Sequence, residues 1–100
     1  YPPYVRMIMF QMAHPDANLV REGAVHFGLL LRKHFSTKVL GPEEPVIPRV
    51  RNNYLRQIYL KLDVQFSIQE SRRIIWSCID EMEGHPEYRK IKVRIDVDPY

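Results

Sequence analysis

The sequence contains few of the residues from which phosphate, metal and redox sites are built. It has one cysteine, Cys78, and four glycines, none of which lies in a Walker A pattern. A lone cysteine cannot form an internal disulfide, which is typical of proteins in a reducing cytosol. The four histidines have no metal-ligand spacing to one another or to Cys78, so no zinc site is predicted. They are His14, His26, His34 and His85.

The chain also lacks an initiator methionine, a signal peptide and a long apolar run. We therefore expect a soluble, cytoplasmic segment of a longer protein, with no membrane partner. Its 100 residues are enough for one domain with a single modest core. The net charge of +3, from 15 basic and 12 acidic residues, is too small to indicate a nucleic-acid partner by itself. Where the charges lie is more informative than their sum.

The first third of the sequence predicts a strand followed by a helix. The run from Val5 to Met12 is apolar and flanked by prolines, as expected for a strand in the middle of a sheet. Pro15 suits the first position of a helix that continues, with apolar residues at helical spacing, to about Phe35. Gly23 and Gly28 lie inside this helix, where we expect them to allow close contact with the sheet.

The middle of the sequence predicts a β-hairpin. Val46 to Arg51 and Tyr54 to Leu62 are extended runs joined at Asn52-Asn53. Asparagine tolerates the positive φ that a tight type I′ turn requires. Pro45 and Pro48 cannot donate backbone hydrogen bonds, so the first of these strands is predicted to lie at an edge of the sheet.

A second helix and a last strand complete the pattern. Ser67 and Glu70 have the spacing of a capping box, and the helix that follows is predicted to end near Gly84. Cys78 in this helix is interpreted as a small buried apolar residue. From Lys90 to Val97 apolar and polar residues alternate, as in a strand with one solvated face. The helix residues expected to face inward are Ile68, Ile75, Ile79 and Met82.

This order of elements predicts an α+β fold with βαββαβ connectivity, the split βαβ or ferredoxin-like arrangement. Both helices are expected on one face of a four-stranded antiparallel sheet. Right-handed crossovers would place the first and third strands in the centre. One predicted edge strand contains proline, and the other is rich in lysine and arginine. Both features fit an edge position.

Several segments, in order, resemble the C-terminal domain of the primosomal replication-restart helicases, the PriA or primosomal protein N′ family. The resemblance covers nearly the whole chain. Its first part is the aromatic-proline segment Tyr1-Pro2-Pro3-Tyr4 followed by Arg6. Its middle part is Leu40-Gly41-Pro42, Pro45, Ile47, Arg49, Tyr54, Gln57, Leu60 and Lys61. Its last part is Ile95-Asp96-Val97-Asp98-Pro99.

The resemblance implies a single domain, residues 1–100, that is a C-terminal accessory domain of a bacterial helicase. Such helicases unwind DNA 3′ to 5′ with ATP, recognise stalled or repaired forks by structure, and help to assemble the primosome. It also implies four partners: forked or single-stranded DNA, the helicase core of the same chain, the acidic tail of single-stranded DNA-binding protein, and other primosome proteins. ATP, magnesium and structural zinc are expected upstream, so this segment itself is predicted to have no cofactor and no catalytic residue.

Basic residues gather in two places, between Glu44 and Asp63 and between Glu87 and Asp96. On a four-stranded sheet, cations around an aromatic residue can hold a nucleic-acid backbone and stack a base. On the open face of the predicted sheet we expect Lys90, Lys92 and Arg94 to lie beside Gln57, Tyr59 and Lys61, with Met7 and Met9 between them. The predicted nucleic-acid-binding residues are Arg49, Arg51, Arg56, Tyr59, Lys61, Lys90, Lys92 and Arg94.

Other interpretations stay open. Lysine and arginine on edge strands also prevent edge-to-edge aggregation, so the domain can instead be a docking module without DNA contact. A small ferredoxin-like enzyme or ligand sensor is a third interpretation, but no convergent catalytic set supports it. Asp96 and Asp98 are on one strand face, where they are expected to end the strand and pair with arginine rather than catalyse. Trp76 and Tyr88 are expected to form a surface packing pair or a docking contact.

Overall fold

The computed structural model describes residues 5–63 and 67–97 as two α-helices and an antiparallel sheet of five strands. The predicted α+β class, with two helices and an antiparallel sheet, is confirmed. No helix within the described ranges is long and apolar enough to cross a membrane. In chain order the elements are β1 (Val5–His14), α1 (Ala17–Phe35), a 3-10 turn (Ser36–Lys38), β2 (Val39–Glu43), β3 (Arg49–Val50), β4 (Asn53–Asp63), α2 (Ile68–Glu83) and β5 (Lys92–Val97).

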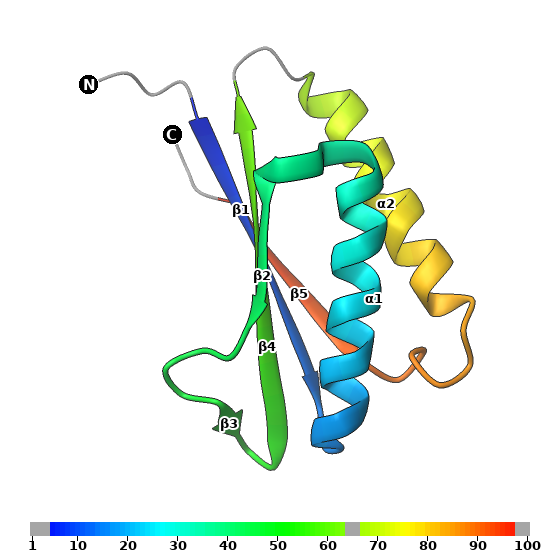
Figure 1. Ribbon diagram of the computed structural model, residues 1–100. Helices are drawn as coiled ribbons and strands as arrows, with labels where there is room; N and C mark the ends of the chain where they lie inside the picture. Colours follow the sequence, from blue (N-terminus) through cyan, green and yellow to red (C-terminus); the bar gives the residue numbers. More distant parts are fainter. Residues whose placement is uncertain (1–4, 64–66, 98–100) are drawn as a thin grey trace.

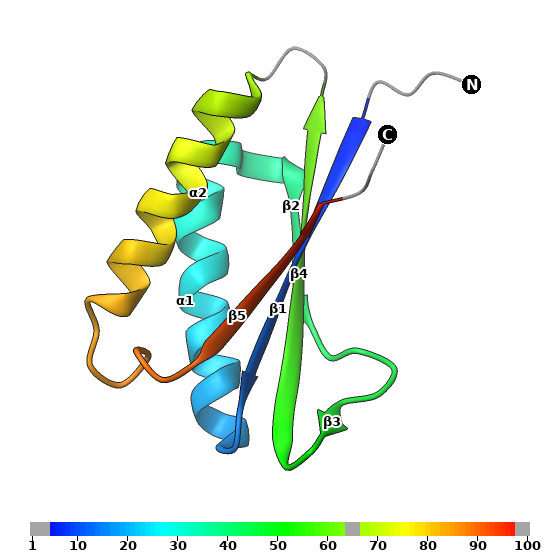
Figure 2. The same ribbon diagram turned by 180° about the vertical axis from the view of Figure 1, so that it is seen from behind.

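The strands are arranged in the order β2-β4-β1-β5, and β3 pairs with β4 as well. The two strands predicted to be central, β1 and β4, lie in the middle of this order and pair without interruption from Val5↔Asp63 to His14↔Tyr54. Both helices cover the same face of the sheet (Figures 1 and 2). This arrangement is compatible with a ferredoxin-like fold. The opposite face, which carries no helix, is called the open face below.

The edge beside β4 differs from the prediction. It is formed by two short strands, β2 and β3, and β2 was not predicted. The strand expected from Val46 to Arg51 is reduced to Arg49–Val50, because Pro45 and Pro48 have no backbone N–H to donate to a hydrogen-bonded ladder. The turn to β4 lies one residue earlier than predicted, since Arg51 and Asn52 have the positive φ values, 53° and 66°. Two successive positive φ values are what a type I′ turn requires.

The helices begin where side chains satisfy their first N–H groups. Asp16 caps α1, because its carboxylate accepts from the N–H groups of Asn18 and Leu19 at 3.0 and 3.2 Å. Pro15 therefore precedes the cap, and its predicted place as the first helical residue is wrong. Ser67 caps α2 as predicted, accepting from the N–H of Glu70 at 3.2 Å.

Three corrections concern the C-terminal half. The carboxylate of Glu70 pairs with Arg73 rather than returning to Ser67. Ile68, predicted to face inward, is exposed, whereas the other three predicted inward residues of α2 are buried. Lys90, predicted to lie in the last strand, comes before β5 in a turn. The Tyr1–Tyr4 segment and Asp98-Pro99, quoted above for the family resemblance, lie outside the described residues.

The core lies between the sheet and the helices. The rings of Phe10 on β1 and Phe27 on α1 meet edge to face, with centroids 5.2 Å apart. Cys78 is buried in this core, as predicted. Gly23 allows α1 to approach the turn before β5, since a Cβ there would overlap Cδ1 of Ile91. Gly28 is buried too, but an added Cβ would meet its neighbours at ordinary distances, so the predicted need for close contact holds only at Gly23.

Candidate nucleic-acid interface

The alternation of side chains along β1 and β4 creates the open face. On β1, Ile8 and Phe10 enter the core, so Met7 and Met9 must lie on the other side of the strand. The same alternation on β4 turns Gln57, Tyr59 and Lys61 to the open face, and on β5 it turns Lys92, Arg94 and Asp96 there. The register thus brings together most of the residues predicted for the sheet face.

Tyr59 lies at the middle of this face. In the strand register, Leu40, Tyr59, Met9 and Asp96 form one row across the sheet, in that order. The ring of Tyr59 is half-buried. The Tyr59 hydroxyl donates to Oε1 of Gln57 at 3.3 Å, which ties the ring to its own strand. An aromatic ring between two apolar side chains is the kind of surface on which a nucleic-acid base stacks.

Cations lie around this row on exposed side chains. Lys61 is opposite Met7, and Arg94 is opposite Gln11 on the far side of β1. Two carboxylates share the face: Asp96, whose Oδ2 is 3.5 Å from Nε of Arg94, and Glu43 at the β2 edge. A third carboxylate, Asp63, forms an ion pair with Lys38. The positive charge is therefore concentrated at Lys61 and along β5 rather than spread over the whole face.

The three arginines of the predicted hairpin do not join this surface. Alternation along β4 turns Arg56 to the same side as the core residue Ile58, where its side chain is 18% exposed and lies 3.3 Å from the carboxylate of Glu44. Arg49 lies over the ring of Tyr54. Arg51 is exposed in the turn. The basic group between Glu44 and Asp63 is thus divided, with Lys61 on the open face and the three arginines elsewhere on the hairpin.

Two further predictions concern Lys90 and the Asp96–Asp98 pair. Lys90 is exposed, but because it precedes β5 the strand register does not place it beside Lys92 and Arg94. Asp98 lies outside the described residues, so the expected Asp96–Asp98 pair has no described geometry. Asp96 itself pairs with an arginine, as the sequence predicted for it.

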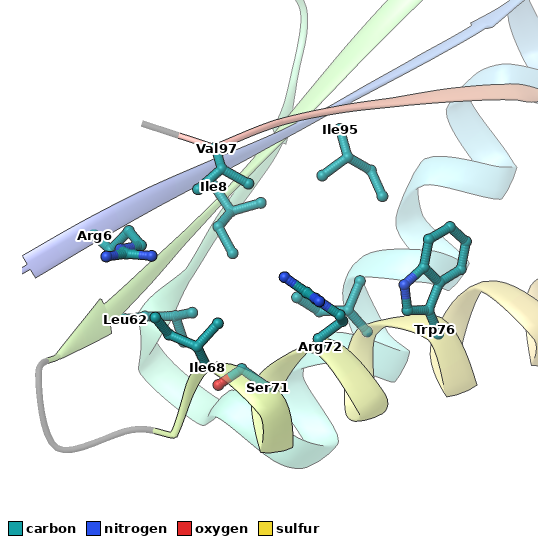
Figure 3. A pocket seen from close by; sticks show the side chains of 10 residues that line it. Arg6, Ile8, Leu62, Ile68, Ser71, Arg72, Trp76, Ile95 and Val97 are labelled. Carbon is teal, nitrogen blue, oxygen red and sulfur yellow. The ribbon is translucent and has the colours of Figure 1, made fainter. Parts of the chain in front are cut away.

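A groove between α2 and the β1–β5 side of the sheet was not predicted. It encloses about 260 Å³ and is open at one side (Figure 3). Ile8, Ile95 and Val97 line it from the sheet, and two guanidinium groups, those of Arg6 and Arg72, lie among the apolar side chains. The other lining residues are Leu62, Ile68, Ser71, Ile75 and Trp76. The sequence signal for this groove is the apolar stripe of the second helix, which extends beyond its buried residues to Ile68 and Trp76.

Trp76 and Tyr88 do not form the expected pair. Trp76 is half exposed at the groove. Tyr88 instead packs against His26 and His85, and the rings of these two histidines are themselves in contact, with centroids 4.7 Å apart. Burial raises the pKa of Tyr88, and the carboxylates of Glu22 and Glu87 raise it further. Within residues 5–63 and 67–97, no group of three or more His, Cys, Asp or Glu side chains is placed to hold a metal ion.

Comparison with known proteins adds three findings. The family described as "Primosomal protein N C-terminal domain" matches residues 1–100. The chain is 24% identical over 103 residues to the "Replication restart protein PriA" of Bacillus subtilis (strain 168), covering 100% of this chain and 12% of that protein. The "De novo designed protein Foldit4" shares the fold at 10% identity, with a TM-score of 0.68, over 96% of this chain and 98% of the designed one.

Proposed function

The chain belongs to the Primosomal protein N C-terminal domain family, and on that premise we propose that it binds single-stranded or forked DNA through the open face of its sheet. In this proposal it is a ferredoxin-like accessory domain of a cytoplasmic 3′ to 5′ helicase that restarts replication. ATP, magnesium and zinc would belong to other parts of such a protein, as would the catalytic residues. The chain spans only 12% of the curated relative that it matches.

The observation that supports DNA binding most directly is the position of Tyr59. In the strand register Tyr59 lies between Met9 and Leu40, with Lys61 on the same strand. The face carries no helix (Figure 1). Base stacking on an exposed aromatic residue contributes about 1 to 3 kcal/mol per base and does not depend on the base. Cations beside such a ring contact phosphates and so position the strand without reading its sequence. We therefore expect weak binding without sequence preference.

Fluorescence anisotropy with a labelled oligonucleotide tests this. Tyr59→Ala should weaken binding to single strands by about 1 to 3 kcal/mol and leave duplex binding nearly unchanged. Tyr59→Phe, which keeps the ring, is the matched control and should bind like the unchanged chain. Equal losses for single and double strands would mean that the ring does not stack. No binding at low salt would contradict the proposal.

Charge reversal tests the phosphate contacts separately. Lys61→Glu and Arg94→Glu should weaken binding equally for all sequences, whereas Lys33→Glu, an exposed position on α1, should have a much smaller effect. If about three phosphates are neutralised, the affinity should fall roughly 10- to 100-fold between 50 and 200 mM salt. A salt-independent affinity would show that the cations do not contact phosphates.

The groove beside α2 favours a second candidate function, docking of a protein segment. Its apolar lining would accept apolar side chains, and Arg6 and Arg72 would attract carboxylates. The hydroxyl of Ser71 is buried there and has no hydrogen-bond partner within the described residues, so a ligand could supply one. An acidic segment with apolar residues has this chemistry. Among the partners that the family resemblance implies, the acidic tail of single-stranded DNA-binding protein fits best.

Adjacent arginines on α2 provide the test of docking. Arg72 lines the groove, whereas Arg73 lies outside it and pairs with Glu70. With a labelled acidic peptide as the probe, Arg72→Ala should weaken binding about 5-fold or more, and Arg73→Ala should not. Equal effects of both changes would mean attraction to the general charge of α2. If the peptide does not bind at all, the groove is not an acidic-peptide site.

A further inference from the structure

The loop between β2 and β3 carries the most exposed apolar side chains of the described residues. Val46 is 100% exposed and Ile47 is 64% exposed, and Val50 in the strand that follows is exposed as well. Single apolar residues on a surface are ordinary, but three within five positions are unusual in a chain with so small a core. The loop projects from the sheet on the side away from the helices (Figures 1 and 2).

The base of this loop is held firmly while its tip is free of the core. Pro45 and Pro48 flank the two apolar residues and restrict the backbone on both sides of them. The carbonyl oxygen of Pro48 accepts from the N–H of Leu55 at 2.9 Å, and β3 continues this attachment by pairing with β4. The tip is therefore presented in a restricted conformation, which lowers the entropy lost on binding.

The charges that follow the tip in the sequence are all positive. Arg49 and Arg51 follow it within a few residues, and both are exposed. From Pro45 to Leu62 the sequence contains no acidic residue, and Glu44, just before the loop, pairs with Arg56. An apolar tip with cations at its base is complementary to a partner that offers apolar faces framed by negative charge. Stacked bases framed by phosphates have this chemistry.

We propose that Val46 and Ile47 form a wedge that inserts where a DNA duplex opens into single strands. The two side chains replace the stacking partner of the last base pair, and Arg49 and Arg51 contact the phosphates on either side. This inference rests on the proposed DNA binding and deepens it, because it assigns recognition of the branch point to the hairpin and leaves the single strand to the open face. Crosslinking distinguishes this DNA contact from a protein partner for the same apolar tip.

A forked DNA with 2-aminopurine in the last base pair before the branch tests the wedge, because this base fluoresces more when it is unstacked. Measurements use the 100-residue chain at saturating concentration, with anisotropy on the same DNA. The unchanged chain should raise the emission at least about twofold. The double variant Val46→Ser with Ile47→Ser should lose this rise but keep its affinity within about threefold, because phosphate contacts supply most of it. The matched control is Val25→Ser with Leu29→Ser, an exposed apolar pair on α1.

The outcomes separate the wedge from DNA binding itself. Binding without a rise in emission, or the same rise with the serine variant, would overturn the wedge and leave the proposed function standing. No binding by the unchanged chain would overturn both. A photoreactive side chain at position 47 should crosslink to the bases at the branch. Crosslinks to another copy of the chain instead would assign the loop to a protein interface and contradict the proposal.

Discussion

Arg49 and Tyr54 lie directly opposite each other on β3 and β4, and the guanidinium carbon of Arg49 is 5.1 Å from the centroid of the Tyr54 ring. The ring packs against the core from the other side. Arg49 also donates to Oδ1 of Asn52 at 3.1 Å, so one side chain joins both ends of the turn. This contact links the exposed hairpin to the buried part of the domain.

Removing the Tyr54 ring should therefore destabilise the fold more than removing the cation. We expect Tyr54→Ala to lower the free energy of unfolding by about 2 to 3 kcal/mol, less than for a fully buried aromatic residue. Arg49→Ala should cost about 0.5 to 1 kcal/mol, since its cation–π contact is exposed to solvent. Urea unfolding measures both, with Tyr54→Phe as the control that keeps the ring. A larger effect of Arg49→Ala would contradict the packing role of the ring.

The two buried glycines of α1 should respond differently to alanine. Gly23→Ala should destabilise the chain by about 1 to 3 kcal/mol, because the new methyl group overlaps Ile91 in a packed region. At Gly28 the nearest atoms, on Arg32 and Pro42, would be 3.5 Å from the added carbon. Gly28→Ala should therefore be neutral or stabilise the helix by up to about 1 kcal/mol. Thermal unfolding of both variants checks this, and a neutral Gly23→Ala would show that Ile91 can move aside.

Stability should depend on the ionisation of Cys78 in mild alkali. Burial raises the pKa of this thiol above its ordinary value of 9.0, Glu81 raises it further, and Lys33 opposes the shift. The unfolded chain then loses this proton at a lower pH than the folded chain does, so stability is unaffected well below pH 9.0 and falls as the pH rises through it. One proton changes the free energy of unfolding by at most about 1.4 kcal/mol per pH unit.

Cys78→Ala provides the control for this pH dependence. This substitution should change the free energy of unfolding by a constant amount around neutral pH. It should also remove part of the decrease in that free energy at alkaline pH. Tyr88, whose pKa is also raised, contributes a slope of the same sign in both proteins and so cancels in the comparison. Parallel curves for the two proteins would mean that the thiol ionises equally in the folded and unfolded chains.

Trp76 reports which side of the domain a ligand occupies. It is the one tryptophan of the sequence and lies half exposed at the groove, on the helix side of the sheet. Single-stranded DNA on the open face should leave its emission unchanged, whereas an acidic peptide in the groove should change it. A fluorescence titration distinguishes the two. DNA-induced quenching that follows the binding curve would place the DNA in the groove.

Local patterns predicted the parts of the fold that depend on local chemistry. The Ser67 cap and the alternation from Lys92 to Val97 each depend on neighbouring residues, and the structure contains both. The hairpin turn was displaced by one residue, because arginine can also adopt the positive φ that asparagine tolerates more readily. Strand β2 was missed since Gly41 and Pro42 normally interrupt a strand, although an edge position tolerates them.

The candidate sites depended on geometry that single residues do not determine. Alternation correctly grouped Tyr59 and Lys61 on one face. The same rule places Arg56, which was also predicted to bind nucleic acid, on the other face. The groove depends on how α2 crosses the sheet. Ile68 and Val97 have the spacing of core residues, yet both line the groove and are about half exposed.

The loop between β2 and β3 can change in sequence without affecting the packing of the core. Residues 44 to 47 lie in no strand and contribute no side chain to the core cluster. Substitutions or added residues there would change what the tip touches while the pairing of β4 with β1 stayed the same. Proteins that share this framework can therefore diverge in the partner they meet at the tip without first having to regain a stable fold.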